Sequence, residues 1–545
     1  MPADRPKSSD HKSLSSPAKN GETQSRGLAS LKPSKNLTNG KDSLLSLSLT
    51  GPHRQTSKHI PSGPDPENKK EAAAEFVSSE AETSQAMGHP RVAAKKTELS
   101  FSDEFKQKKK DKKTETDRKL LDSDRWLVRN GHALTYAGLY LFSILVLFRP
   151  YELVPALSFL SSTAFYFALV TLAIYLPAQL ATEGNFTMLS TEVKAVLAMT
   201  LIALLTMPIA KDPALAWEKF NDPFIKAVLI FIVLVNVVRT RKRLMGLMWL
   251  SISIGIYLSY AALDLYMSGK FNVEEYRVAV DVGGMFGNPN EMAMHFVMMT
   301  PLVITLGIAS KSSLARWAYY GMAALFVGAN MVTFSRGGFL GLIACCFVLA
   351  WKIGRKQRLN VSIVSLGVGG IAVLAAPGNY GLRMLSIFVP GLDAVGSSDQ
   401  RRELLERSII VTLRNPWGIG IGNFPIVGVR NLQSHNAFTQ VSAELGLLGL
   451  AAYLVFIISP FRKLSAIERT LFDKEDTGWF YYLAIGLQAS IVGYLVSSFF
   501  ASVAYNWFIY YLIAYAVAFR RIYALEKGAT EKAEAPGASM ELRPA

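Results

Sequence analysis

The chain has 545 residues, of which 50% are hydrophobic and 18% are charged, and its formal net charge is +16. Because the charged residues are clustered between long apolar stretches, the composition excludes an ordinary water-soluble globular protein and indicates membrane spans joined by loops. The two cysteines, Cys345 and Cys346, are adjacent inside an apolar stretch, so we expect packing residues and neither a disulfide nor a metal site.

The first 125 residues are rich in Ser, Lys, Glu and Pro and contain no apolar stretch long enough for a span. Such a segment buries too little apolar surface to offset the entropy lost on ordering, so we predict a disordered tail over residues 1–125. No apolar core follows the charges of the first ten residues, so we expect no signal peptide and a cytoplasmic tail. The basic run at 106–113 is either an attachment point for anionic lipid or a solvated part of the tail.

Beyond residue 125 the apolar runs are long enough to cross a hydrocarbon core of about 30 Å as helices. Helix is expected because the bilayer interior offers no water to backbone groups. We therefore predict an all-α polytopic membrane protein, with a transmembrane domain at 126–525 and a cytoplasmic C-terminal tail at 526–545. About twelve spans are expected, at 131–148, 153–176, 192–210, 223–239, 245–267, 291–309, 316–334, 337–353, 360–377, 437–460, 478–500 and 504–519.

The orientation of the spans follows from the basic residues, because positively charged loops are retained in the cytoplasm. Basic clusters follow alternate spans, as expected if both termini are cytoplasmic, and they lie at 239–243, 311–316, 352–358, 462–463 and 520–521. They account for much of the net charge, so we expect membrane lipids and no nucleic acid as partners. The periplasmic face of an inner membrane then receives a long loop at 378–436.

Three polar segments on this outer face are not explained by packing alone. The first contains Arg277 and the turn GNPN at 287–290, where Asn288 and Asn290 are good helix caps. The second is a charged break between two apolar runs at Ser335–Arg336. An arginine held so close to hydrocarbon is costly, and its planar fork of donors suits a phosphate oxygen.

The third segment covers the end of the long loop and the start of the following span. It contains the glycine-rich run PWGIGIGNF at 416–424, then His435 and Asn436, and then Glu444. The unperturbed imidazole pKa of about 6.5 suits proton transfer near neutral pH. A lone histidine at a helix start is ordinarily a cap or surface residue, so the interpretation as a base depends on the other two segments.

Together the three segments resemble the O-antigen ligase and O-antigen polymerase family of integral-membrane glycosyltransferases. The resemblance covers roughly residues 130–520. It is carried by R…G.FGNPN.MA at 277–293, FSRGGFLGL at 334–342 and NPWGIGIGNF…SHNAFTQVSAELGLLGL at 415–450. The tail at 1–125 departs from the usual pattern of this family and suggests a regulatory or anchoring addition.

The resemblance implies transfer of a glycan from a polyprenyl-diphosphate donor to a glycan or lipid acceptor at the periplasmic face, without a metal or cofactor. Arg277 and Arg336 would neutralise the departing diphosphate, and His435 would take the proton of the acceptor hydroxyl. The candidate substrate-binding residues are Arg401, Arg402, Arg407, Asn288, Asn436 and Glu444, and Arg414 and Arg430 are further loop arginines.

Other functions remain open at this point. A secondary transporter, such as a bicarbonate transporter, also has about twelve spans, but its charges are expected near the bilayer midplane instead of at the outer ends of spans. A non-catalytic scaffold fits the basic tail but not the His and Arg set. Ligase and polymerase use the same donor chemistry: the single outer loop with a late histidine favours a ligase, and the basic tail leaves an exopolysaccharide or capsule polymerase open.

Overall fold

The computed structural model describes residues 126–533, with gaps at 154, 161–162, 275, 283–285, 357–358, 361–362, 364–366, 368, 371–375, 377, 379, 388 and 390–396. The predicted tail at 1–125 and most of the predicted ninth span lie outside the described residues. The described part contains helices and no strand, apart from one isolated antiparallel bridge between Val273 and Arg277. The predicted all-α fold class is confirmed.

Nine helices in the described part are long and apolar enough to cross a membrane, which confirms a polytopic membrane protein. The helices α4 (Thr163–Glu183) and α10 (Ser313–Val332) have comparable lengths of 21 and 20 residues. The total of about twelve spans stays a prediction. The nine are α2 (Trp126–Leu147), α5 (Thr191–Thr206), α6 (Pro213–Lys219) continuing into α7 (Ile225–Val237), α8 (Arg241–Met267), α9 (Pro289–Ala309), α11 (Arg336–Ile353), α17 (Gly446–Asp473), α18 (Trp479–Ser497) and α19 (Trp507–Ala533).

The second predicted span differs from the helix that forms. The second span, predicted at 153–176, lies later, in α4. It follows a short helix α3 (Pro150–Leu153) and a 3-10 segment (Pro155–Leu160), because proline favours the start of a new helix and interrupts an existing one. The helix α19 continues to Ala533, past the predicted start of the C-terminal tail at 526, and this domain boundary stays a prediction.

The tenth span, predicted as one helix at 437–460, is broken into α16 (Ala437–Glu444) and α17. Gly446 lies at the break with a φ of 72°, a left-handed conformation that glycine adopts without a side-chain clash. The backbone of Pro416–Gly418 packs against this break and leaves no room for a Cβ at Gly446. Because α16 is a separate short helix, its first turn can point into the outer part of the bundle.

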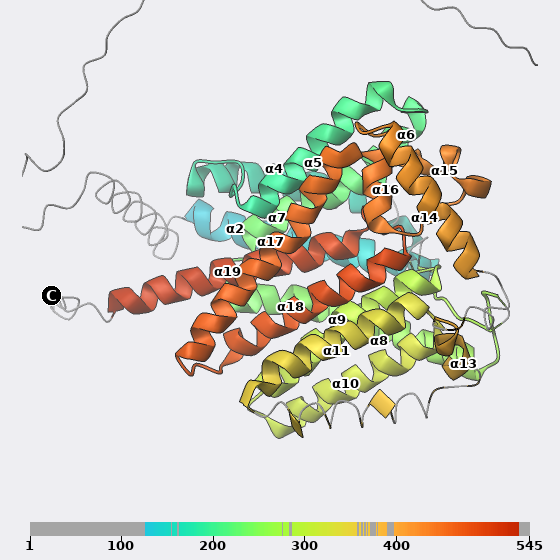
Figure 1. The fold of residues 1–545 in the computed structure, drawn as a ribbon. Helices are drawn as coiled ribbons and strands as arrows, with labels where there is room; N and C mark the ends of the chain where they lie inside the picture. Colours follow the sequence, from blue (N-terminus) through green and yellow to red (C-terminus); the bar gives the residue numbers. More distant parts are fainter. Residues whose placement is uncertain are drawn as a thin grey trace, which may run out of the picture. The chain divides into compact units, whose positions relative to one another are not determined.

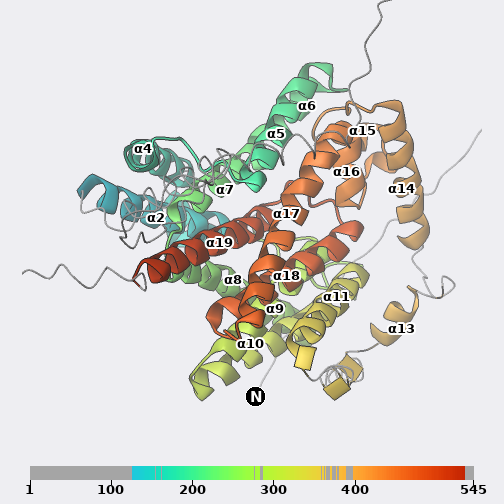
Figure 2. The same ribbon diagram turned by 60° about the vertical axis from the view of Figure 1, so that its left-hand side comes forward.

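The helix α9 is the most buried of the candidate spans, with 83% of its most apolar window buried. It packs against α10, α11 and α18, as the two ribbon views show (Figures 1 and 2). Small residues allow α18 to approach its neighbours: a Cβ at Gly493 would lie 2.7 Å from Val297 on α9 and 3.3 Å from Cys345 on α11. Cys345 is fully buried there, which agrees with a packing role.

Two separate groups of polar contacts join segments that are far apart in the sequence. In the first, Glu192 pairs with Lys463 and Arg520, Glu183 pairs with Arg239 and Arg521, and Glu468 pairs with Lys352 and Arg355. The second group joins the segments around residues 277, 290, 335, 383, 435 and 502. Members of the two groups alternate along the chain, as connections at opposite ends of antiparallel spans must.

Candidate functional site

The turn between α10 and α11 positions Arg336. Ser335 caps α11, because its Oγ accepts a hydrogen bond from the backbone N–H of Gly338 at 3.1 Å. Arg336 is therefore the first residue of α11, and it is 7% exposed. A Cβ at the neighbouring Gly337 would lie 2.9 Å from the Phe500 side chain. Because Gly337 has no side chain, the turn between α18 and α19 can pack against it.

Arg277 stabilises the turn between α10 and α11, called the α10–α11 corner below. Its guanidinium donates to the Thr333 carbonyl at 2.9 Å, to the Asn290 side-chain oxygen at 3.1 Å and to Glu274 at 3.3 Å. The Asn290 oxygen also accepts from Ser335 Oγ at 2.8 Å. Arg277 is 4% exposed, and its side chain is occupied in holding the corner.

Asn288 is the helix cap expected from the sequence. Its side chain accepts from the backbone N–H of Asn290 at 2.9 Å and so fixes the start of α9. Neither Asn288 nor Arg277 lines the cavity described below. Both residues act on the geometry of the corner in the described structure.

His435 precedes α16 and has a φ of 51°, which is uncommon for a residue other than glycine. Its backbone N–H donates to Ser502 Oγ at 2.8 Å. The next residue, Asn436, caps α16 by accepting from the backbone N–H groups of Phe438 and Thr439 at 2.9 and 3.1 Å. The imidazole is half-buried, and this burial, together with the positive charge of Arg401, lowers the pKa of His435.

A cavity of about 760 Å³, part of which is open solvent, joins the two positions. Both basic or polar and apolar side chains line it. The basic and polar ones are Arg336, Arg401, Arg402, Ser434, His435 and Asn436, and the apolar ones are Leu340, Ile387, Leu405, Phe499 and Phe500. The side chains come from α11, from α14 (Ser397–Arg414), from the segment before α16 and from the end of α18.

The electrostatics of this cavity are set by its arginines. Burial, followed by the positive charges of Arg336, Arg277 and Arg383, lowers the pKa of Arg401 to about 10. Glu274 acts in the opposite direction, but its effect is the smallest of these. Positive charge therefore dominates around Arg401. Among the described residues, no group of three or more His, Cys, Asp or Glu side chains could hold a metal ion.

Besides Asn288, two further predicted binding residues, Arg407 and Glu444, do not line the cavity. Arg407 donates to the Val427 carbonyl at 2.8 Å and holds the short helix α15 (Phe424–Val427) against α14. Glu444 is fully buried, and one of its oxygens accepts from the backbone N–H of Phe424 at 3.4 Å. Glu444 therefore anchors the end of the glycine-rich loop at 416–424.

Phe499, Phe500 and Ser502 are functional candidates that the sequence analysis did not select. They lie just after an apolar span, where two phenylalanines and a serine give no polar pattern. Only the packing of this turn against Gly337 and His435 identifies them.

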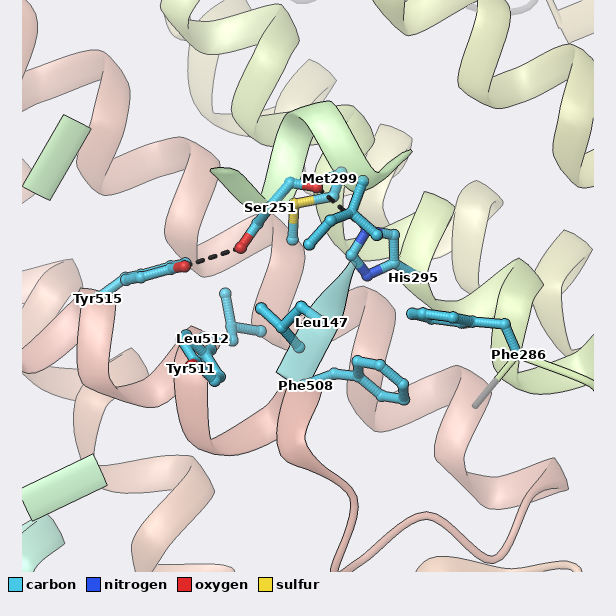
Figure 3. Close-up of a pocket in the computed structure, with 10 residues that line it drawn as sticks. Leu147, Ser251, Phe286, His295, Met299, Phe508, Tyr511, Leu512 and Tyr515 are labelled. Carbon is cyan, nitrogen blue, oxygen red and sulfur yellow. Dashed lines mark hydrogen bonds between the residues drawn. The ribbon is translucent and has the colours of Figure 1, made fainter. Parts of the chain in front are cut away.

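A second, smaller hollow lies inside the bundle, between α8, α9 and α19 (Figure 3). The Ser251 hydroxyl is 2.8 Å from that of Tyr515, and His295 Nε2 is 3.2 Å from the Ser251 carbonyl. A carbonyl only accepts, so Nε2 carries the proton. Leu147, Phe286, Met299, Phe508 and Leu512 supply apolar walls, and no Arg or Lys lines it. The hollow is therefore unsuited to a diphosphate.

Comparison with known families adds an independent finding. The model of the O-antigen ligase family matches residues 321–454. The matched segment contains Arg336, Arg401, Arg402 and His435, which line the cavity, whereas Arg277 and the turn at 497–506 lie outside it. No curated protein matches the chain significantly.

Proposed function

We propose that this membrane protein transfers a glycan from a polyprenyl-diphosphate donor to an acceptor hydroxyl at the periplasmic face of the inner membrane, because its segment at 321–454 matches the model of the O-antigen ligase family. The observation that carries the proposal is the cavity that places Arg336 and Arg401 beside His435. The same donor chemistry serves ligation and polymerisation, so the proposal covers both kinds of acceptor.

The basic and the apolar lining residues of the cavity suit the two parts of such a donor. Guanidinium groups remain charged and bind phosphate oxygens through paired donors, so Arg336 and Arg401 are suited to the diphosphate. Burial strengthens this attraction because water screens it less. Phe499, Phe500 and Leu340 offer an apolar surface to the first units of the polyprenyl chain.

In the proposed reaction the acceptor oxygen attacks the anomeric carbon of the donor sugar. The bond between that carbon and the phosphate oxygen breaks, and the diphosphate leaves with the electron pair. His435 takes the proton of the acceptor hydroxyl, and its lowered pKa keeps the imidazole unprotonated at neutral pH. The arginines neutralise the charge that develops on the diphosphate, so the proposed mechanism is metal-independent.

Arg277 has a revised role in this mechanism. Since its three donor groups hold Thr333, Asn290 and Glu274, we assign it to positioning Arg336 instead of contacting the donor. Glu444 and Arg407 likewise fix the loop beside the cavity. Arg402, which is exposed and paired with Glu406 at 3.1 Å, lies at the cavity rim.

The test separates donor binding from transfer in purified protein reconstituted with a polyprenyl-diphosphate-linked glycan. We expect Arg336→Ala to retain less donor, and His435→Ala to retain donor but to transfer it about 10²–10⁴ times more slowly. Arg414→Ala, a loop arginine outside the cavity, should behave like the parent protein. Parental transfer by both cavity variants, or solute transport by protein that transfers no glycan, would overturn the proposal.

A further inference from the structure

The turn between α18 and α19 touches the backbone at both candidate catalytic positions. Ser497, the last residue of α18, donates through its Oγ to the Gly337 carbonyl at 3.1 Å, one residue after Arg336. Five residues later, Ser502 Oγ accepts from the backbone N–H of His435 at 2.8 Å. This turn lies outside the segment that matches the family model.

The contact with α11 is close enough to fix the start of that helix. At Gly341, one helical turn after Gly337, a Cβ would clash with Ser497 Oγ and would lie 3.0 Å from the Gly493 carbonyl. At Gly337 itself the nearest atom is the Phe500 Cβ. The first turn of α11, which carries Arg336, is therefore held directly against the end of α18.

The contact with His435 is a directed chain of hydrogen bonds. Ser434 Oγ is 2.9 Å from the Asn436 carbonyl, which can only accept, so the Ser434 hydroxyl donates there. Ser434 Oγ is also 3.1 Å from Ser502 Oγ, and this second bond must then take its proton from Ser502. Ser502 consequently donates to Ser434 while it accepts from His435.

This chain offsets a local strain. The left-handed backbone of His435, with a φ of 51°, is unfavourable for a residue other than glycine and persists where its surroundings enforce it. Ser502 supplies both an acceptor for the His435 N–H and a donor for Ser434. Serine and threonine provide both functions through one short side chain, whereas alanine provides neither.

We propose that Ser502 is a positioning residue for His435, and that the α18–α19 turn, through Ser497 and Ser502, sets the placement of His435 relative to Arg336. The inference rests on the proposed function of these two residues. Neither serine contacts substrate in this mechanism. They act through the backbone of the residues that do.

The experiment compares Ser502→Ala with Ser502→Thr in the reconstituted transfer assay. Displacing a reacting group by about 1 Å can cost about 10²-fold in rate, so we expect Ser502→Ala to lower kcat by about 10- to 100-fold with little change in the KM for donor. Ser502→Thr should restore most of the rate, because it keeps a hydroxyl that accepts and donates.

The pH profile provides a readout that a purely structural role would not move. Arg336, Arg401 and Arg402 line the cavity with His435, and burial near Arg401 lowers the histidine pKa. If Ser502→Ala lets the imidazole move towards water, the acid limb of its kcat profile should shift to higher pH, towards about 6.5.

The matched control is Ser490→Ala on α18, the helix that leads into the turn. Ser490 Oγ is buried and donates to the Met298 carbonyl at 2.6 Å, so its removal also costs a serine hydrogen bond, but away from the cavity. We expect it to keep the parental kcat and pH profile. If Ser502→Ala does not fold, Ser434→Ala breaks the same chain and should give the same loss of kcat.

Two results would overturn the inference. One is a parental kcat for Ser502→Ala, and the other is an equal loss for Ser490→Ala. In a His435→Ala background, Ser502→Ala should add no further loss, because both substitutions act on one group. A large loss for His435→Ala beside a parental Ser502→Ala would reject this inference and keep the proposed function. A parental His435→Ala would reject both.

Discussion

Arg336 begins α11, so its side-chain charge adds to the positive end of the helix dipole at the same place in the cavity. A lysine there would keep the charge but lose the planar fork that can grip two phosphate oxygens at once. We therefore expect Arg336→Lys to insert and express normally and to lose most glycan transfer. Transfer and protein amount, measured on the same membranes, check this. Near-parental transfer would mean that charge alone is required.

At His435 the prediction concerns pH. Burial and the positive charge of Arg401 lower its pKa, so the fraction of unprotonated base, and with it kcat, should fall only below about pH 6.5. Replacing Arg401 by Gln removes a positive neighbour that disfavours the imidazolium. The acid limb of the remaining activity should then shift to higher pH. A kcat–pH profile of parent and Arg401→Gln measures this shift, and a shift to lower pH would contradict it.

Residue types and motifs in the sequence were sufficient to select Arg336, Arg401, Arg402 and His435, which share one cavity. They could not show the direction of Arg277, which lies in the same motif but turns inward to the Thr333 carbonyl. The direction of a side chain depends on neighbours brought together by the fold. For the same reason Ser502, a single serine after an apolar span, gave no signal.

Among the elements, α13 (Tyr380–Leu385) is attached to the α10–α11 corner by an apolar cluster and by the hydrogen bonds of Arg383. Arg383 donates to the Phe334 carbonyl at 2.9 Å, to the Tyr276 hydroxyl and to Glu274 at 3.4 Å. Just beyond the helix, Ser386 accepts from Arg336 at 3.4 Å, and the next residue, Ile387, lines the cavity. The helix therefore links the charged corner to one side of the site.

We expect Arg383→Gln to raise the KM for donor severalfold while changing kcat less, because loosening α13 disturbs the wall of the cavity more than the base. Steady-state kinetics with varied donor measure both constants. The control is Glu406→Gln, which breaks the exposed Arg402–Glu406 pair, since such surface pairs contribute little to stability. A fall in kcat at unchanged KM would assign Arg383 to the chemical step instead.

For the helices, hydropathy located the membrane spans more accurately than the residues at which they begin and end. Apolar runs identify segments that avoid water, and most predicted spans coincide with helices. Hydropathy does not distinguish one helix from two that meet end to end, so the break at Gly446 was missed. That break depends on the distant backbone at Pro416–Gly418, which packs against it.

For the whole molecule, the two groups of polar contacts limit how the chain can lie in a membrane. Pairs with a fully buried carboxylate, such as Lys352–Glu468 at 2.8 Å and Arg520–Glu192 at 2.5 Å, join segments that the basic clusters predict to be cytoplasmic. The segments around Arg336 and His435 belong to the other group. Burying a charge is offset only when the charge is paired. A segment of one group therefore cannot move to the other group without leaving a buried charge unpaired.

This arrangement predicts the accessibility of the loops. A reporter fused after Gly354 or Ser465 should behave as cytoplasmic, and one inserted near Ser397, in the loop that carries Arg401, as periplasmic.

A cysteine scan tests the same prediction without fusions. In a chain lacking Cys345 and Cys346, a cysteine at Ser397 should react with a membrane-impermeant maleimide in cells whose outer membrane is permeabilised. A cysteine at Ser465 should react only after the inner membrane is opened. Ser397 is the first residue of α14, the helix that also carries Arg401. The side of the membrane on which Ser397 lies is therefore also the side on which the cavity lies. Labelling of Ser465 but not Ser397 in permeabilised cells would place the cavity in the cytoplasm, away from an acceptor at the outer face, and would remove the proposed glycan transfer together with its mechanism.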